Sequence, residues 1–515
     1  MKNFILKYWQ EKPLLCILSL AGFFRLLAVI FSKGYGMHDD HFLVIEAAQS
    51  WVNGYDYNDW IPSITKGLVT PSGHSLLYPG LHYVLFRMLE FFGITDPQSK
   101  MYVVRFIHAV LSMSIVYLGY RMAEKINGSS AAKTTGLILA LLFFMPMFSV
   151  RNLVEFVCIP PMLYATWLVM KNEEKKKKFP LLLSGIMLAL ALSVRFQTIL
   201  FIGGFYLALL LQKKWKEIFL SATGFIFCIA IVQGITDIII WERPFAELTE
   251  YVRYNMEHAN EYITQKWYNY IILLAGILIP PVSIFILFGF LRNWKKHLLL
   301  FLPSFIFLIF HSYFPNKQER FILPIIPFII TLGVCGWTDF VAHSGFWQKR
   351  QKLLRACWIF FWTVNFIPLV FISTAYSHRS RVEAMVYLSK KKDFKNFIVE
   401  ESQHEGFTMP PLFYLRHWLS YPYVTKPFTL DSLAERISST PDSLKANYVV
   451  FNEEENIEER IQNFKKLYPT MEFDVIIEPG LVDKVMHKLN KRNANFRCYI
   501  FRINKRNPFS PPTNY

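Results

Sequence analysis

Long apolar blocks dominate the first three quarters of the chain. Residues 14–31, 134–150, 218–241 and 358–375 carry few or no charges. A helix needs about 20 apolar residues to cross a bilayer, whereas a core helix of a soluble protein needs only one apolar stripe. The blocks therefore predict helices that face lipid all round, and one large soluble α-helical protein is a poor alternative.

Basic residues stand in short clusters between these blocks. The positive-inside rule assigns such clusters to cytoplasmic loops. With the N-terminus in the cytoplasm, eleven crossings keep every cluster inside. The predicted spans are about 14–32, 101–121, 134–150, 153–170, 180–195, 196–212, 217–241, 269–291, 298–312, 320–341 and 353–375. The apolar segment 76–92 would invert this order if it crossed, so it is predicted to lie at the outer surface.

The composition agrees with a membrane protein. Hydrophobic residues make up 53% of the 515 residues, charged residues only 18%, and the mean hydropathy is +0.27. The net charge of +17 could suggest a nucleic-acid partner. The positive charge lies in loops between predicted spans, so we attribute it to membrane topology. We therefore expect no nucleic-acid partner.

The tail after the last span differs in pattern. Strand-like runs at 447–452, 473–478 and 496–503 alternate with helical patterns at 457–467 and 482–489, which is typical of a small α/β domain. We predict a transmembrane catalytic module at 1–375, whose outer loop is 33–100, and an extracytoplasmic soluble α/β domain at 376–515. The fold class is thus an α-helical polytopic membrane protein with a C-terminal α/β domain.

Two adjacent aspartates open the outer loop 33–100. Asp39 and Asp40 stand between His38 and His41, directly after the first predicted span. A carboxylate at the membrane surface can act as general base toward a hydroxyl. Capping of the helix that follows is an alternative reading. A divalent metal held by His38, Asp39, Asp40 and His41 is another, and no cofactor is certain.

A second outer loop carries basic residues on the disfavoured side of the membrane. Lys317 and Arg320 lie between two predicted spans, where the positive-inside rule does not expect them. Basic residues in such places usually have a partner, and a phosphate is a good candidate. The alternative is an ion pair of Arg320 with Glu319 or with an aspartate of the first loop.

A third outer segment is rich in aromatic and amide side chains. It contains Arg253, Tyr254 and Asn255 and runs on to residue 268. Such side chains suit sugar binding, although an aromatic interface belt explains them nearly as well. Single charges near the ends of predicted spans, or within one in the case of Arg25, are expected to face a cavity or a partner, because charge is costly in lipid. They are Arg25, Arg151, Glu155 and Arg195.

Together these motifs resemble the GT-C glycosyltransferases, most closely the family-22 mannosyltransferases of GPI-anchor and N-glycan assembly. That family carries a His-Pro-Asp-Glu-His-Phe-like stretch, whose second half resembles residues 39–42, while Met37 and His38 depart from it. The family's His-Lys-Glu-x-Arg-Phe-like stretch resembles Lys317, Glu319 and Arg320, with Asn316 in the histidine place. The resemblance covers about the first 340 residues. Further positions that look like the family's are Tyr78, Arg151, Arg253, Tyr254 and Asn255.

The resemblance implies an inverting glycosyltransferase with a polyprenyl-phosphate-sugar donor. Asp39 would be the general base, Asp40 would orient the acceptor or a metal, and Lys317 with Arg320 would bind the donor phosphate. The expected substrate-binding residues are His41, Tyr78, Arg151, Arg253, Tyr254, Asn255 and Glu319.

The sugar is mannose or another hexose, and the acceptor is a glycan, a lipid or a protein. The expected partners also include membrane lipids, and the expected location is the inner membrane of a bacterium. A lipid-linked glycan flippase and an O-antigen ligase or polymerase are the alternative functions.

Overall fold

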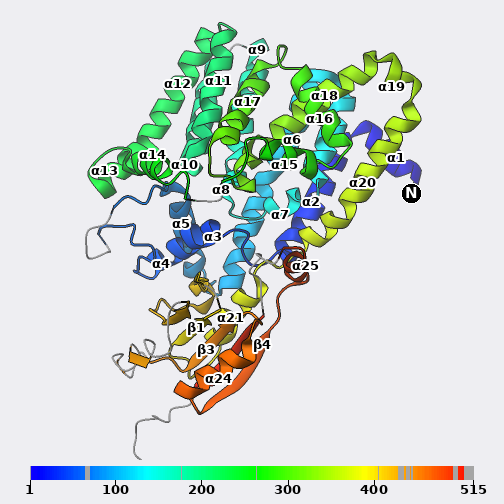
Figure 1. Ribbon diagram of the computed structural model, residues 1–515. Helices are drawn as coiled ribbons and strands as arrows, with labels where there is room; N and C mark the ends of the chain where they lie inside the picture. Colours follow the sequence, from blue (N-terminus) through cyan, green and yellow to red (C-terminus); the bar gives the residue numbers. More distant parts are fainter. Residues whose placement is uncertain are drawn as a thin grey trace, which may run out of the picture. The chain divides into compact units, whose positions relative to one another are not determined.

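The computed structural model describes residues 2–63, 70–175, 177–261, 264–403, 405–426, 434–435, 441, 445–490 and 497–503 (Figure 1). The chain forms two compact units. The first contains Met1–Ser32, Asn58–Met88 and Met101–Thr374, and the second contains Lys33–Tyr57, Leu89–Lys100 and Ala375–Tyr515. The second unit thus includes two stretches of the long loop in addition to the tail.

The first unit is helical, as the apolar blocks predict. Its elements are α1 (Lys2–Glu11), α2 (Pro13–Phe31), most of α5 (Leu77–Phe91) and of α6 (Pro97–Leu141), α7 (Met145–Phe148), α8 (Val154–Val157), α9 (Ile159–Lys175), α10 (Phe179–Val194), η2 (Phe196–Thr198), α11 (Ile199–Leu211), α12 (Trp215–Ile229), η3 (Ala230–Ile235), α13 (Thr236–Trp241), α14 (Ala246–Glu257), α15 (Asn269–Ile277), α16 (Val282–Arg292), α17 (Leu298–Tyr313), η4 (Glu319–Ile325), α18 (Ile326–His343), α19 (Gly345–Lys349) and α20 (Gln351–Ser373). Among the described residues, six helices are long and apolar enough to cross a membrane, and four shorter apolar helices accompany them.

The predicted number of about eleven crossings is not confirmed, because several predicted spans are broken. α6 consists of two helices that meet at Asn127 and Gly128, which lie between the predicted spans 101–121 and 134–150. The predicted span 134–150 is divided between the end of α6 and the short α7, and the span 269–291 between α15 and α16. Among the described residues, fewer single helices are both apolar and long enough to span than the apolar blocks predict.

Glycines allow some helices of this unit to touch backbone to backbone. A Cβ on Gly185 of α10 would lie 1.8 Å from the Ser221 carbonyl oxygen of α12, and one on Gly224 would lie 2.1 Å from the Leu182 carbonyl oxygen. Only glycine fits at such a crossing, and small residues are the usual contact residues of packed membrane helices. Figure 1 shows α10, α11 and α12 running side by side.

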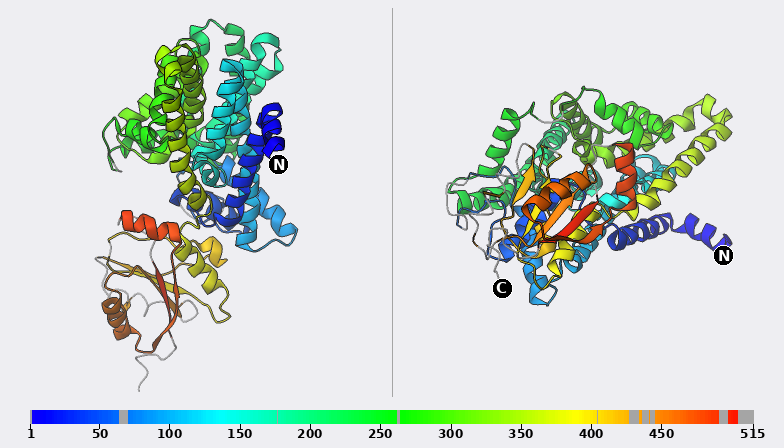
Figure 2. Two further views of the ribbon diagram at one scale, coloured as in Figure 1. Left: turned by 90° about the vertical axis from the view of Figure 1, so that its right-hand side faces the viewer. Right: turned by 60° about the horizontal axis from the view of Figure 1, so that its bottom comes forward.

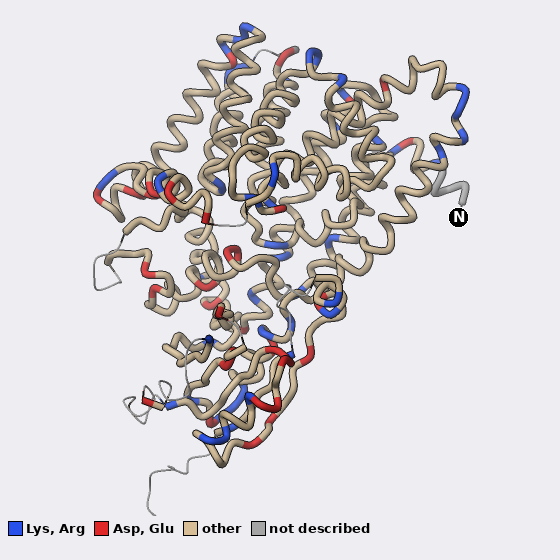
Figure 3. The backbone as a smooth tube through the Cα atoms, in the orientation of Figure 1, with Lys and Arg blue, Asp and Glu red and all other residues tan. Residues whose placement is uncertain are grey.

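The charge distribution separates loops from helices. Lys and Arg occur at the turn between α11 and α12 and where α19 passes into α20, while Lys, Arg, Asp and Glu are sparse in the middle of the helical bundle (Figure 3). The few charges inside the bundle are buried. Arg25 is 1% exposed and donates from Nε to the Ser112 hydroxyl at 3.0 Å, so its partner is a hydroxyl rather than an acidic neighbour.

The second unit contains the predicted α/β domain. Its five strands form a sheet in the order β2-β1-β3-β5-β4. The three strands β2, β1 and β3 are parallel, while β5 is antiparallel to both β3 and β4. The elements are α21 (Arg379–Ser389), β1 (Phe397–Glu401), α22 (Leu412–Leu415), β2 (Tyr423–Thr425), β3 (Tyr448–Asn452), α24 (Ile457–Leu467), β4 (Met471–Ile477), α25 (Leu481–Leu489) and β5 (Cys498–Ile503).

The three predicted strands and both predicted helices of the tail are confirmed within one or two residues, whereas β1 and β2 were missed. β1 is buried at all five positions, which hides the alternation of a half-exposed strand. It also ends in Glu400 and Glu401, which are unusual in a buried strand. Glu400 is nevertheless compensated there by Arg460 of α24, whose Nε lies 2.8 Å from Glu400 Oε2. Figure 2 shows α24 and α25 at different ends of the sheet.

Candidate functional site

The two aspartates lie in the first turn of a helix in the second unit. α3 (His38–Asp40) continues into the π-helix η1 (His41–Glu46) and then α4 (Ala47–Val52). Met37 is the N-cap residue of α3, and Asp40, at the N-cap of η1, makes no side-chain capping bond. The capping alternative is therefore not observed for Asp40. Asp39 is half-buried and Asp40 is 5% exposed.

His41 points into the same unit and is held there by Glu46. Its Nε2 lies 3.0 Å from Glu46 Oε1, and both side chains are almost fully buried. Glu46 also accepts a hydrogen bond from the Phe413 backbone N–H at 3.0 Å, and burial raises the pKa of its carboxyl. The His41 ring stacks between Tyr35 and Tyr414. These contacts fix the π-helix that follows the aspartates.

A metal centre receives no support from the geometry of these residues. His41 is engaged by Glu46, and the exposed His38 ring packs on Phe42 at 4.4 Å. Within the part of the chain that the structure describes, no three His, Cys, Asp or Glu side chains gather closely enough to hold a metal ion. We therefore derive no step through a metal at His38 or Asp40.

A buried carboxylate joins two arginines in the first unit. Glu155 of α8 is fully buried, and its Oε1 lies 3.0 Å from Nη2 of Arg195 and 3.5 Å from Nε of Arg320. Arg320 also donates from Nε to Gln318 Oε1 at 2.8 Å. The expectation that Glu155 and Arg195 face a partner is confirmed, since each is the other's partner. Glu319, the neighbour considered for Arg320, is exposed.

Lys317 is a buried cation at the end of α17. Its Nζ donates to the carbonyl oxygens of Phe314, at 2.5 Å, and His311, at 3.3 Å, where α17 ends. A helix C-terminus favours a cation because its last carbonyl groups lack partners within the helix. Burial lowers the pKa of the Lys317 ammonium, which is 3% exposed.

The rings of His311 and Phe321 connect Lys317 to the arginines. The two ring centroids are 6.2 Å apart, and the Phe321 ring lies 5.5 Å from the Arg195 guanidinium and 5.9 Å from that of Arg320. Two arginines therefore contact one buried carboxylate, and the rings link Lys317 to them, so these four residues carry a net positive charge. We call Arg195, Lys317, Arg320 and Glu155 the cationic cluster. Arg195 was not predicted as a site residue, although the rule that charges at membrane edges need partners had singled it out.

The remaining predicted contacts are scattered over the first unit. The Tyr78 hydroxyl lies 2.6 Å from His108 Nε2, and Arg151 Nη2 donates to the Ser32 hydroxyl at 3.0 Å. Both residues are buried. The segment 253–255 lies on α14, where the exposed Arg253 pairs with acidic residues one turn away on the same helix.

A structural carboxylate on α14 holds part of the long loop. Glu247 is fully buried, and its Oε2 accepts from the Ser72 hydroxyl at 2.9 Å and from the backbone N–H groups of Gly73, at 2.7 Å, and His74, at 3.2 Å. Its other oxygen accepts from Trp241 Nε1 at 2.9 Å. This contact pattern was not predicted, because no local signal links residues about 175 positions apart.

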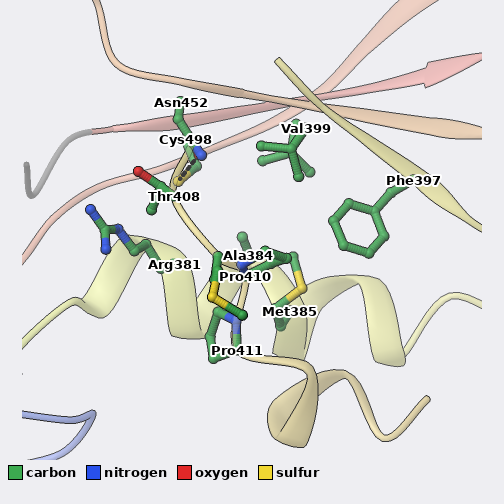
Figure 4. Close-up of a pocket in the computed structure, with 12 residues that line it drawn as sticks. Arg381, Ala384, Met385, Phe397, Val399, Thr408, Pro410, Pro411, Asn452 and Cys498 are labelled. Atoms are coloured by element: carbon green, nitrogen blue, oxygen red, sulfur yellow. Dashed lines mark hydrogen bonds between the residues drawn. The ribbon is translucent and has the colours of Figure 1, made fainter. Parts of the chain in front are cut away.

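A pocket in the second unit is formed by residues outside the predicted site (Figure 4). It encloses about 270 Å³, including space open to solvent, and its lining combines Arg381 with apolar side chains such as Phe397 and Val399. The Cys498 thiol donates to Asn452 Oδ1 at 3.2 Å. Burial raises the pKa of this thiol to about 12. Because only a thiolate is a good nucleophile, Cys498 is a packing residue.

Comparison with solved structures identifies the fold. The structure is similar to ArnT from Cupriavidus metallidurans bound to undecaprenyl phosphate, with a TM-score of 0.61, 12% identity, and coverage of 95% of this chain and 98% of that one. The apo form of that ArnT gives a TM-score of 0.60 at 13% identity, covering 95% and 97% of the two chains. The oligosaccharyltransferase of Archaeoglobus fulgidus, in complex with Zn and sulfate, gives 0.53 at 12% identity, covering 85% and 68%. No curated protein sequence matches the chain significantly.

The helical module and the sheet domain thus have the fold of the GT-C class of integral-membrane proteins. Residues 16–425 match the model of the Alg9-like mannosyltransferase family, and the chain belongs to this family. Membership makes the chain an enzyme, a glycosyltransferase, rather than a flippase.

Proposed function

We propose that this enzyme transfers a sugar from a polyprenyl-phosphate-sugar donor to an acceptor hydroxyl at the extracytoplasmic face of the membrane, with inversion at the anomeric carbon. The observation that carries the proposal is the cationic cluster, in which Arg195 and Arg320 share one carboxylate and Lys317 is bound at the end of α17. A lipid phosphate is the anion that such a cluster at the end of membrane helices would meet. ArnT, which has a similar fold, is bound to undecaprenyl phosphate in its crystal structure.

In the proposed reaction, Asp39 removes the proton from the acceptor hydroxyl. The acceptor oxygen attacks the anomeric carbon from the side opposite to the phosphate, and the bond from that carbon to the phosphate oxygen breaks. The polyprenyl phosphate leaves as an anion, whose charge Lys317 and Arg320 neutralise. Stabilisation of developing charge by fixed cations is a major source of catalysis. Asp40, which is buried, orients the acceptor side of the site.

Arg195 is added to the proposed phosphate site, because Glu155 holds it beside Arg320. The substrate contacts proposed from sequence remain His41, Tyr78, Arg151, Arg253, Tyr254, Asn255 and Glu319. His41 is proposed in addition to support the helix of Asp39 and Asp40, since Glu46 engages its Nε2.

Mannose is the proposed sugar, because the chain belongs to a family of mannosyltransferases. The basic clusters between the helices support an N-terminus in the cytoplasm and an outer α/β domain. The inner membrane of a bacterium is the proposed location.

Asp39→Asn tests the general base. A positioned base contributes typically about 10²- to 10⁴-fold to rate, so we expect a loss of that size in sugar transfer with normal membrane insertion. Asp59→Asn is the matched control, because Asp59 is an exposed aspartate of the same loop. Turnover retained in Asp39→Asn would sink the assignment.

Lys317→Ala combined with Arg320→Ala tests the phosphate site. Removing one donor from a charge-stabilising site costs about 10²- to 10³-fold in rate, and we expect at least this loss in kcat/KM for the lipid-linked donor. Arg243→Ala is the control, because Arg243 is an exposed arginine of the 242–268 segment. An unchanged dependence on donor concentration would argue against the phosphate site.

A further inference from the structure

Helix α25 of the α/β domain exposes its apolar side chains and buries its acidic one. Its apolar side chains Leu481, Val485 and Leu489 are 66%, 50% and 77% exposed, while its acidic residue Asp483 is only 6% exposed. At 3.6 residues per turn, positions 481, 485 and 489 fall within an arc of about 80° on one face of α25. A helix on a water-soluble domain normally shows the reverse arrangement.

Cations border this apolar face. Lys484 and Lys488 are both exposed, and Lys484 is paired with Glu478 at 2.7 Å between Nζ and Oε2. A helix with an exposed apolar face and lysines along its edge is the pattern of helices that lie in the lipid interface. The long apolar stem of a lysine can follow the acyl region while its ammonium reaches the headgroups.

The chain itself holds the start of α25 close to the end of a membrane span. Gly480, the N-cap residue of α25, packs so tightly against Tyr376 that a Cβ would lie 2.7 Å from the Tyr376 carbonyl oxygen. Tyr376 follows Ser373, the last residue of the span Gln351–Ser373, by three residues. Three extended residues reach at most about 11 Å, so Tyr376 cannot move far from the span, and the backbone packing keeps Gly480 with it.

A second tether acts at the same point. The backbone N–H of Ser377 donates to the Lys33 carbonyl oxygen at 3.1 Å, and Gly34 and Ser377 form a parallel bridge. Lys33 follows Phe31, the last residue of the span Pro13–Phe31, by two residues. The residues that support the start of α25 therefore follow the ends of two membrane spans by only two or three positions in the chain.

From these observations we infer that α25 lies in the lipid surface, with Leu481, Val485 and Leu489 in the apolar zone and Lys484 and Lys488 among anionic headgroups. This inference goes beyond the proposed function and does not depend on it. The helix anchors the α/β domain against the membrane, at the height where a lipid-linked substrate presents its headgroup.

Spin labels on the full chain test this position. Cys16 and Cys357, the two half-buried native cysteines, are replaced by Ala, since the other four are buried. One label is then placed at Val485→Cys or at Leu489→Cys, in vesicles of phosphatidylethanolamine and phosphatidylglycerol. A label at Gln462→Cys is the control, because Gln462 is an exposed position on α24, at a different end of the sheet from α25.

We expect the labels at 485 and 489 to collide with oxygen but to be protected from a water-soluble nickel chelate, at a depth of about 5–10 Å. The label at 462 should be accessible to the chelate. Chelate access at 485 and 489 equal to that at 462 would overturn the inference. Protection from both reagents would also overturn it, because protein, such as a second copy of the chain, would then cover the helix.

A charge on the apolar face gives a second test. Leu489→Glu in the Val485→Cys chain should increase the chelate access of the label at 485 several-fold, since a carboxylate resists burial in lipid. An unchanged chelate access would count against a lipid contact. Sugar transfer is measured on the same samples, so that loss of the lipid contact and loss of activity are distinguished.

Discussion

The α/β domain depends on one buried ion pair whose removal has a calculable cost. Arg460 on α24 is 6% exposed and reaches Glu400 on β1, which is 2% exposed. Its Nε donates to Glu400 Oε2 at 2.8 Å, and Nη2 donates to the same oxygen. The guanidinium also donates to the carbonyl oxygens of Glu400 and Asn452, both at 2.9 Å. One side chain thus ties α24 to two neighbouring strands.

Arg460→Met keeps the apolar stem of this side chain and removes its charge. Glu400 would then be a buried carboxylate without its counter-ion. Breaking a buried pair from one side costs about 3–5 kcal/mol. Because about 1.36 kcal/mol corresponds to a factor of ten, the sheet should open roughly 150 to 5,000 times more often.

Hydrogen exchange of the full chain, read by mass spectrometry, measures this opening in peptides from β1 and β3. Arg460→Met should speed exchange there by the factor above and leave peptides of the first unit unchanged. Replacing both partners, Arg460→Met with Glu400→Leu, should recover most of the protection, because no buried charge remains. Exchange within tenfold of wild type in the single variant would refute the reasoning. A double variant as labile as the single one would show that the cost lies elsewhere.

Two further predictions concern the first unit. Burial raises the pKa of Glu247 to about 7. The protonated carboxyl therefore stabilises the fold fully below about pH 4.5, and this stabilisation is lost as the pH rises through 7. The loss in free energy of unfolding is about 3 kcal/mol. Thermal unfolding should show a fall in stability between pH 5 and pH 8 that is smaller in Glu247→Gln, and equal falls would contradict the pKa. Gly185→Ala should lower the unfolding temperature, since its Cβ would lie 1.8 Å from a carbonyl oxygen of α12 and overpacking costs about 1–3 kcal/mol. Gly203→Ala, whose Cβ would meet nothing within 4 Å, should leave the unfolding temperature unchanged or slightly raised, and equal loss in both would refute the packing argument.

The sequence predicted those features of the fold that depend on neighbouring residues. The helix over 457–467 was predicted with its observed bounds, because its polar and apolar positions alternate at helical spacing. Apolar length predicted the membrane helices and the turn around Asn127, but not the breaks between α6 and α7 and between α15 and α16. The break between α15 and α16 contains Pro280 and Pro281, which interrupt a helix, and apolar length alone does not register them. β1 was missed because its Glu400 is acceptable in a buried strand only once Arg460 packs against it.

For the candidate site, the sequence by itself determined which residues are proposed to carry the chemistry. It singled out Lys317, Arg320 and the aspartate pair from their position relative to apolar blocks and from the motif resemblance. Only the tertiary structure decided that Arg195 joins Arg320 through Glu155, since these residues are 40 and 165 positions from Glu155 along the chain. The outward-facing apolar side of α25 likewise became visible only when the sheet was in place. Periodicity shows that a helix has two faces, but which face is buried depends on what packs against it.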